Sequence, residues 1–181
     1  MPPHYPPVML VDGYNVIGVW QRLQAMRDAV GFESARSELI ETMINFSAYH
    51  GYKTTVVFDA YNLDTAGKTE KLTKHLKLHY TEHKQTADTY IEKACGQFYR
   101  DPMRHLKRII VVTSDRAQQL TAIGFGAEWM SALALQQEVE ITFKSVKHRQ
   151  KAQAQDTKKL LGNRIDLETK ERLAKLRESL D

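Results

Sequence analysis

The sequence contains a single cysteine, Cys95, which excludes an intrachain disulfide. It has no apolar run close to the roughly 20 residues that a membrane-spanning helix needs. Residues 1–7 show no basic stretch followed by an apolar one, so we expect no signal peptide. These absences lead us to expect a cytoplasmic protein with no membrane partner. They leave its oligomeric state open.

Two nucleotide-binding motifs are also missing. No Gly-x-x-x-x-Gly-Lys-Ser/Thr loop occurs, which excludes a P-loop NTPase. No Gly-x-Gly-x-x-Gly follows the first apolar run, which argues against a Rossmann cofactor fold. His75, His79 and His83 recur every four residues, but they lie in a strand-like stretch without a cysteine partner, so a zinc site is the less favoured interpretation.

The residues that are present suit a globular domain. The chain has 181 residues, of which 42% are hydrophobic and 27% charged, enough for one core and an appendage. The formal net charge of +4 permits a polyanionic partner without requiring one.

Short apolar runs alternate with amphipathic segments along the first 130 residues. We predict strands at residues 8–11, 54–58, 75–81, 108–112 and 127–130, and helices at 33–50, 87–100 and 116–123. This alternation predicts an α/β fold with a mostly parallel central sheet and helices on both faces.

A long helix is predicted to start after Ser131, which would cap it. Gly162 and Asn163 are expected to break the chain, and Asp166 to cap a final helix. We therefore predict a main domain at residues 1–152 and a C-terminal helical extension at residues 153–181.

Acidic residues follow the predicted strands. Asp12, Asp59 and Asp115 each come at or just after the end of an apolar run, and the carboxyl ends of parallel strands meet at one edge of a sheet. Asp88 lies in the first turn of its helix, and Glu92 is four residues later on the same helical face. Each acid alone could simply cap a helix or form a surface ion pair.

Taken together, these acids favour a metal site. Carboxylates crowded at one edge repel one another unless a cation neutralises them. Mg²⁺ or Mn²⁺ prefers oxygen ligands and recruits phosphate oxygens, so the pattern suits phosphodiester cleavage by a metal-activated water. Such a water would attack the phosphorus in line and leave a 5′-phosphate and a 3′-hydroxyl.

The polar stretch at residues 62–74 is predicted to be an exposed loop. An ordinary connector is the commoner interpretation. The functional alternative is a mobile basic arm in which Lys68, Lys71 and Lys74 touch phosphates. Three tyrosines could stack bases, although packing is the more frequent role of such rings: Tyr14, Tyr61 and Tyr80.

Four segments together resemble the YacP-like NYN-domain proteins of the PIN-like nuclease superfamily. They read DGYNVI at residues 12–17, VVFDA at 56–60, TAD at 86–88 with IE at 91–92, and VTSD at 112–115. In order, strand context and spacing, the likeness covers about residues 8–143.

The resemblance implies a PIN-like three-layer fold and a metal-dependent endoribonuclease that cleaves single-stranded RNA. It implies that Asp12 and Asp88 are the catalytic carboxylates and that Asp115 and Glu92 complete the metal site. Asn15 and Ser114 would orient ligands or water. The best-studied relatives are ribosome-associated and cut messenger RNA in the ribosomal A site, which makes the ribosome an expected platform.

Two other classes remain open. The first is a non-catalytic RNA- or ribosome-binding module that keeps the PIN shape. The second is a phosphatase or phosphotransferase, which usually has an Asp-x-Asp pair after the first strand. Here Tyr14 stands two residues beyond Asp12, which argues against that class.

Overall fold

The structure is a computed structural model that describes residues 5–60 and 67–178, with side chains through Gln155 and at Thr157 and Thr169. The chain forms two compact units, residues 1–139 and 140–181. This boundary comes from the packing of the chain and does not show where a nuclease domain ends. The division predicted between residues 152 and 153 therefore stays a prediction. No helix of the described residues is long and apolar enough to span a bilayer.

A six-stranded sheet runs through the first unit, in the order β3-β4-β2-β1-β5-β6. Its strands are β1 (Val8–Asp12), β2 (Lys53–Phe58), β3 (Thr69–Lys71), β4 (Leu76–Tyr80), β5 (Ile109–Val112) and β6 (Glu128–Met130). Every neighbouring pair is parallel except β3 with β4. The expected mostly parallel sheet is confirmed.

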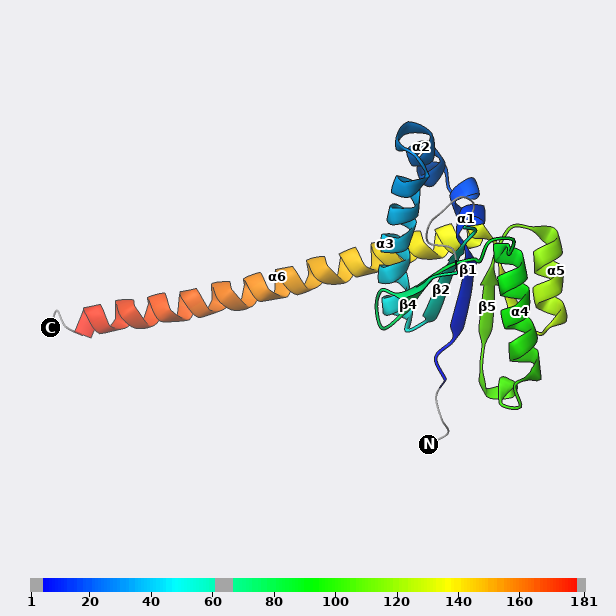
Figure 1. Ribbon diagram of the computed structural model, residues 1–181. Coiled ribbons are helices and arrows are strands. Elements are labelled where there is room, and N and C mark those ends of the chain that lie inside the picture. The colour runs from blue at the N-terminus through cyan, green and yellow to red at the C-terminus, as the bar shows by residue number, and fades with distance from the viewer. Residues whose placement is uncertain (1–4, 61–66, 179–181) are drawn as a thin grey trace. The chain divides into compact units, whose positions relative to one another are not determined.

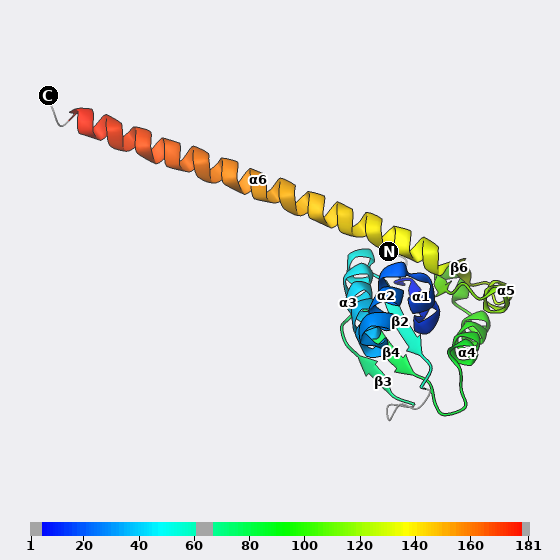
Figure 2. The same ribbon diagram turned by 90° about the horizontal axis from the view of Figure 1, so that it is seen from above.

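Helices cover both faces of this sheet (Figures 1 and 2). Helices α1 (Gly13–Val19), α2 (Gln21–Val30) and α3 (Phe32–His50) lie on one side, and α4 (Ala87–Arg100) and α5 (Arg116–Gly124) lie on the other. A short 3₁₀ turn, η1 (Arg104–Leu106), follows α4, and α6 (Ala132–Glu178) ends the described chain. This is the expected three-layer α/β arrangement.

The alternation of side chains along β1 explains the two layers. Met9 and Val11 point into the core beneath α1–α3, whereas Leu10 points into the core beneath α4 and α5. The first turns of α6 add Ala132, Leu135 and Val139 to the first of these cores. A strand buried on both faces must be apolar at every position, which is how β1 reads.

Local signals set where the helices begin and end. Thr86 caps α4, its hydroxyl accepting a hydrogen bond of 3.2 Å from the Thr89 N–H. Gly51 ends α3 in a left-handed conformation with φ of 70°.

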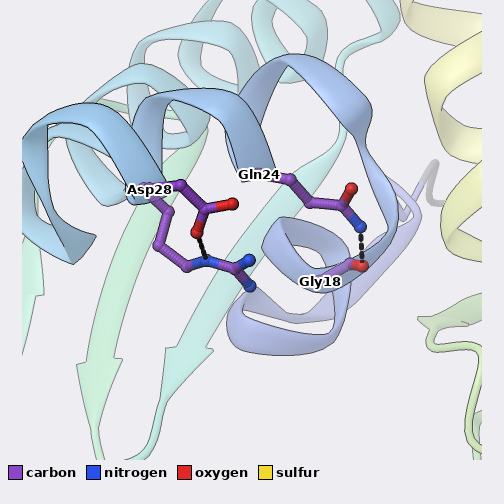
Figure 3. Close-up of polar contacts among 4 residues, drawn as sticks. Gly18, Gln24 and Asp28 are labelled. Carbon is purple, nitrogen blue, oxygen red and sulfur yellow. Dashed lines mark hydrogen bonds and ion pairs between the residues drawn. The ribbon is translucent and has the colours of Figure 1, made fainter.

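Side-chain hydrogen bonds also link neighbouring parts of α1 and α2 (Figure 3). The Gln24 amide of α2 donates to the Gly18 carbonyl oxygen of α1. Within α2, the Arg27 Nε donates to Asp28 at 2.8 Å.

Two expectations about connections were wrong. The stretch at residues 62–74 is not all loop, because β3 pairs antiparallel with β4 at its end; residues 61–66 of that stretch lie outside the described residues. Helix α6 also continues through Gly162 and Asn163 without the expected break. A glycine inside a helix costs only about 1 kcal/mol relative to alanine, so helix formers on both sides outweigh it.

Candidate active site

The carboxyl ends of the three central strands bring several acids to one edge of the sheet. Asp12, the last residue of β1, is in register with Val57 of β2, so Asp59 follows two residues beyond that level. Val11 is in register with Val112, the last residue of β5, and Asp115 follows three residues later. Parallel pairing therefore places one acid at the end of each of β2, β1 and β5.

Asp12 is half-buried, whereas Asp88 and Asp115 are exposed. Its Oδ1 caps α1 by accepting a 3.0 Å hydrogen bond from the Asn15 N–H. The pKa of the Asp12 carboxyl is raised to about 6, mainly by burial and also by the charges of Asp88, Asp59 and Asp115, while the bond from the Asn15 N–H acts to lower it. Ionising the Asp12 carboxyl at neutral pH in the folded protein therefore costs free energy.

Asp88 comes to the same edge from the first turn of α4. Burial raises the pKa of its carboxyl, and the charges of Asp115 and Asp59 add to the rise. A 2.6 Å hydrogen bond from the Gln118 Nε2 to Asp88 Oδ1 opposes this shift. The pKa values of Asp12 and Asp88 are therefore both raised, first by burial and then by neighbouring acids.

The other two acids are fixed by backbone donors. Asp115 caps α5, and its Oδ1 accepts a 2.9 Å hydrogen bond from the Gln118 N–H. The Asp59 Oδ1 accepts from the Ala87 N–H at the start of α4. Asp59 thus anchors the start of the helix that carries Asp88.

Asn15 links two of the strand ends. Its Oδ1 accepts a 2.8 Å hydrogen bond from the Ser114 N–H, while its own N–H holds Asp12. The Ser114 hydroxyl in turn accepts from the Ala132 N–H at 3.2 Å. The loops after β1 and β5 are therefore tied to each other beside Asp12 and Asp115, and both Asn15 and Ser114 lie at the acidic edge.

In the described part of the chain, no lysine, arginine or histidine is paired with the acids of this edge. Within residues 5–60 and 67–155, the ion pairs do not involve Asp12, Asp59, Asp88 or Asp115. Asp12, Asp88 and Asp115 each use Oδ1 for a protein hydrogen bond, which leaves Oδ2 of each without a recorded partner. An all-oxygen set with unrelieved charge fits Mg²⁺ or Mn²⁺ in its chemistry.

The acids have the right chemistry for a divalent ion, but they are not yet arranged around one position. In the part of the chain that the structure describes, no group of three or more histidine, cysteine, aspartate or glutamate side chains is arranged to hold one ion as it stands. Binding a cation would therefore require the free carboxylate oxygens to move closer together.

Glu92 lies beside Asp88 but away from Asp12. Glu92 and Asp88 line a cavity of about 150 Å³ between α4 and α5, together with Cys95 and Gln118. The charge of Glu92 acts on the buried Cys95 thiol, whose pKa burial raises to about 11, so this thiol stays protonated at neutral pH. Glu92 is not among the charges that act on Asp12.

Gln118 is a site residue that the sequence did not single out. It is buried, holds both Asp88 and Asp115, and its Oε1 has no hydrogen-bond partner among the described residues. Nothing in its position along α5 distinguishes it from Gln119, so only the three-dimensional contact reveals its role.

The structure does not bring the three predicted RNA-binding lysines together. The Lys68 carbonyl accepts from the Tyr80 N–H, which places Lys68 near the carboxyl end of β4, on the acidic side. Lys71 pairs with Lys77 further down β4, and Lys74 lies in the turn before β4, towards the opposite end of the sheet. Only Lys68 is near the acids.

The described tyrosines pack against protein groups. The Tyr14 ring meets Phe32 and Phe58 edge-on, and its hydroxyl accepts a 2.9 Å hydrogen bond from Arg36. The Tyr80 ring stacks on Phe58 with centroids 5.9 Å apart. Packing is thus the observed role of these two rings, and Tyr61 lies outside the described residues.

The chain is similar to known proteins over most of its length. The YacP-like NYN domain profile matches residues 9–178. The chain is 36% identical to the protein YacP of Bacillus subtilis (strain 168) over 143 residues, which cover 78% of this chain and 80% of that protein.

Two crystal structures of Rae1 (YacP) from Bacillus subtilis are also similar. One is 32% identical, with a TM-score of 0.67, covering 93% of this chain and 94% of that one. The other, a mutant, is 34% identical with a TM-score of 0.66, covering 79% of this chain and 80% of that one.

Proposed function

Because this chain belongs to the YacP-like NYN domain family, within the PIN-like nuclease superfamily, we propose that it is a divalent-metal-dependent endoribonuclease acting on single-stranded RNA. One observation carries the proposal. Burial, together with the charges of Asp88, Asp59 and Asp115, raises the pKa of Asp12 to about 6, and no protein cation is paired to these acids among the described residues.

Asp12, Asp88 and Asp115 are the proposed metal ligands, through the carboxylate oxygens that the protein leaves unbonded. A bound Mg²⁺ or Mn²⁺ would lower the pKa of water and stabilise the negative charge that builds up on the phosphate. Glu92, exposed beside Asp88 on α4, is proposed as a further carboxylate of this site.

The protein residues supply position. Asn15 fixes Asp12 through its N–H and the Ser114 loop through its side chain, so both strand ends keep one spacing when RNA enters. Because the Ser114 side chain is exposed at this edge, its hydroxyl is placed to orient a phosphate oxygen or a water. Lys68 is proposed to contact the RNA backbone on the same side.

Cleavage of a 5′-labelled single-stranded RNA tests the proposal. The unsubstituted protein should cut it with Mg²⁺ or Mn²⁺, leave 5′-phosphate and 3′-hydroxyl ends, and stop when EDTA is added. Asp12→Asn and Asp88→Asn should each lose at least about 100-fold in rate, more than loss of a supporting residue costs. Asp28→Asn, at the exposed Asp28 of α2, is the control. Full cleavage by either site variant would remove the proposal.

A non-catalytic RNA-binding module is the second candidate, and one observation favours it: no preformed group of three ligands exists among the described residues. It predicts that the RNA binds but stays intact at every Mg²⁺ and Mn²⁺ concentration. The same assay therefore separates the two candidates.

The ribosome as the platform and the cytoplasm as the location stay predictions. Ribosome association would appear as co-sedimentation of the protein with purified ribosomes, in a buffer without EDTA and at physiological salt.

A further inference from the structure

A second charged surface lies on the sheet away from the acidic edge. Lys53, Lys71, Lys74 and Lys77 line one cavity of about 310 Å³, together with Val8 and His75. We call these four lysines the lysine face. The cavity lining contains no acidic residue, and within the described residues none of the four lysines forms an ion pair.

The strand register places Lys53, Lys71 and Lys77 on the α4 side of the sheet. Lys53 and Lys77 share that side with Val57 and His79, because side chains alternate along each strand. Lys71 stands directly opposite Lys77 across the β3–β4 pair. The Tyr90 ring of α4 stacks on His79 at 4.0 Å, but Lys77, two residues earlier, is exposed.

The Lys71–Lys77 pair is unfavourable for the fold alone. Like charges placed directly opposite in a sheet destabilise it. Lys53 lines the same cavity, and its Nζ donates a 2.9 Å hydrogen bond to the Lys74 carbonyl oxygen. A bound polyanion would turn this repulsion into attraction.

The neighbouring surface indicates a nucleic acid rather than a simple anion. A second cavity of about 440 Å³ shares Val8 and Lys53 with the first. Tyr5 and Phe98 are among its lining residues, as are Asp101 and Lys107, which form an ion pair. Single-stranded RNA places phosphates on lysines and stacks bases on aromatic rings.

The lysine face is also close enough to the acids for one strand to reach both. Lys77 is in register with Thr55, and Thr55 with Leu10, two residues before Asp12. Two residues along a strand and two strands across correspond to roughly 12 Å between backbone positions.

We propose that the lysine face binds the phosphate backbone of single-stranded RNA a few nucleotides from the acidic edge, and that it does so without a divalent ion. The choice of RNA rests on the proposed function. Without a cation the acidic edge repels phosphates, so RNA affinity measured in EDTA reports on other surfaces.

The test is fluorescence anisotropy of labelled single-stranded RNA with the full chain in EDTA, over a series of salt concentrations. Lys71→Gln/Lys77→Gln should bind at least about 5-fold more weakly and lower the salt slope by about 1.4, the value for two phosphate contacts to a single strand. The control Lys93→Gln/Lys144→Gln removes the same charge at exposed positions elsewhere and should change little.

Thermal unfolding separates lost binding from lost folding. Removing the like-charge pair should leave the midpoint of the double variant unchanged or raise it. Equal affinity and slope in the variant and the unsubstituted protein would overturn the proposal, as would an equal loss in the control or no RNA binding in EDTA. Failure of the nuclease proposal looks different: RNA binds through the lysine face but is never cut.

Discussion

The side-chain amide of Gln118 donates a 2.6 Å hydrogen bond to Asp88. The N–H of the same residue donates to Asp115 at 2.9 Å, so one residue of α5 orients two acids that lie 27 positions apart in the chain. Both bonds use Oδ1, so that Oδ2 of each acid has no hydrogen-bond partner among the described residues. This residue acts on the site through the acids, as a positioning residue.

Replacing Gln118 should therefore change how cleavage depends on pH. In Gln118→Met, Asp88 loses the hydrogen bond that lowers its pKa, so that pKa rises further and the acid limb of the pH–rate profile moves to higher pH. A hydrogen bond to a charged group contributes about 1.5–3 kcal/mol, which corresponds to a loss of roughly 10–100-fold in rate below that limb. Gln119→Met is the matched control. An unshifted acid limb would contradict this role.

Asp12 should make the metal-free protein less stable as pH rises. The pKa of its carboxyl is about 6 in the folded protein and 3.8 unfolded, so the folded state holds the proton more tightly. Stability is lost as pH rises from about 4 to about 6, by roughly 3 kcal/mol in total. Asp12→Asn should thus raise the free energy of unfolding at pH 8 much more than at pH 4, by urea unfolding in EDTA.

The control for this prediction is Asp28→Asn. The pKa of the exposed Asp28 is lowered by its hydrogen bond with Arg27, so this substitution should not stabilise the protein at pH 8. Equal effects of the two substitutions at pH 8 would count against a charged, buried Asp12.

Gly13 should tolerate no side chain. A Cβ at this position would overlap the buried ring of Phe58, which itself packs against Tyr14 and Tyr80. Gly13→Ala should cost about 1–3 kcal/mol in the free energy of unfolding, as overpacking does. Gly18→Ala is the control, because its Cβ would meet nothing within 4 Å. Equal unfolding midpoints for the two variants would contradict the close approach.

The strand ends could be predicted from the sequence because two local signals coincide there. Val8–Asp12 joins an apolar run to a polar turn, and the β5 run Ile109–Val112 does the same. Parallel pairing then puts Asp12 and Asp115 at one edge without any knowledge of side-chain contacts. Thr86 was likewise predictable as a cap, since it precedes an amphipathic helix.

Other features depend on contacts that no local signal encodes. Gln118 reaches Asp88 across 30 positions, and no motif marks it. Strand β3 is three exposed polar residues that pair only because β4 offers an open edge. The same hairpin carries Lys74 away from Lys68, so residues close in sequence end at different parts of the sheet.

Mn²⁺ binding, followed by electron paramagnetic resonance at pH 7.5, tests most directly whether the acids at the ends of β1 and β5 and the start of α4 hold a divalent ion. The unsubstituted protein should remove free Mn²⁺ from solution saturably. Asp12→Asn and Asp88→Asn should each weaken this binding at least about 10-fold, whereas Asp28→Asn should bind as the unsubstituted protein does. Unchanged Mn²⁺ binding in both site variants, or no binding by the unsubstituted protein, would contradict the account.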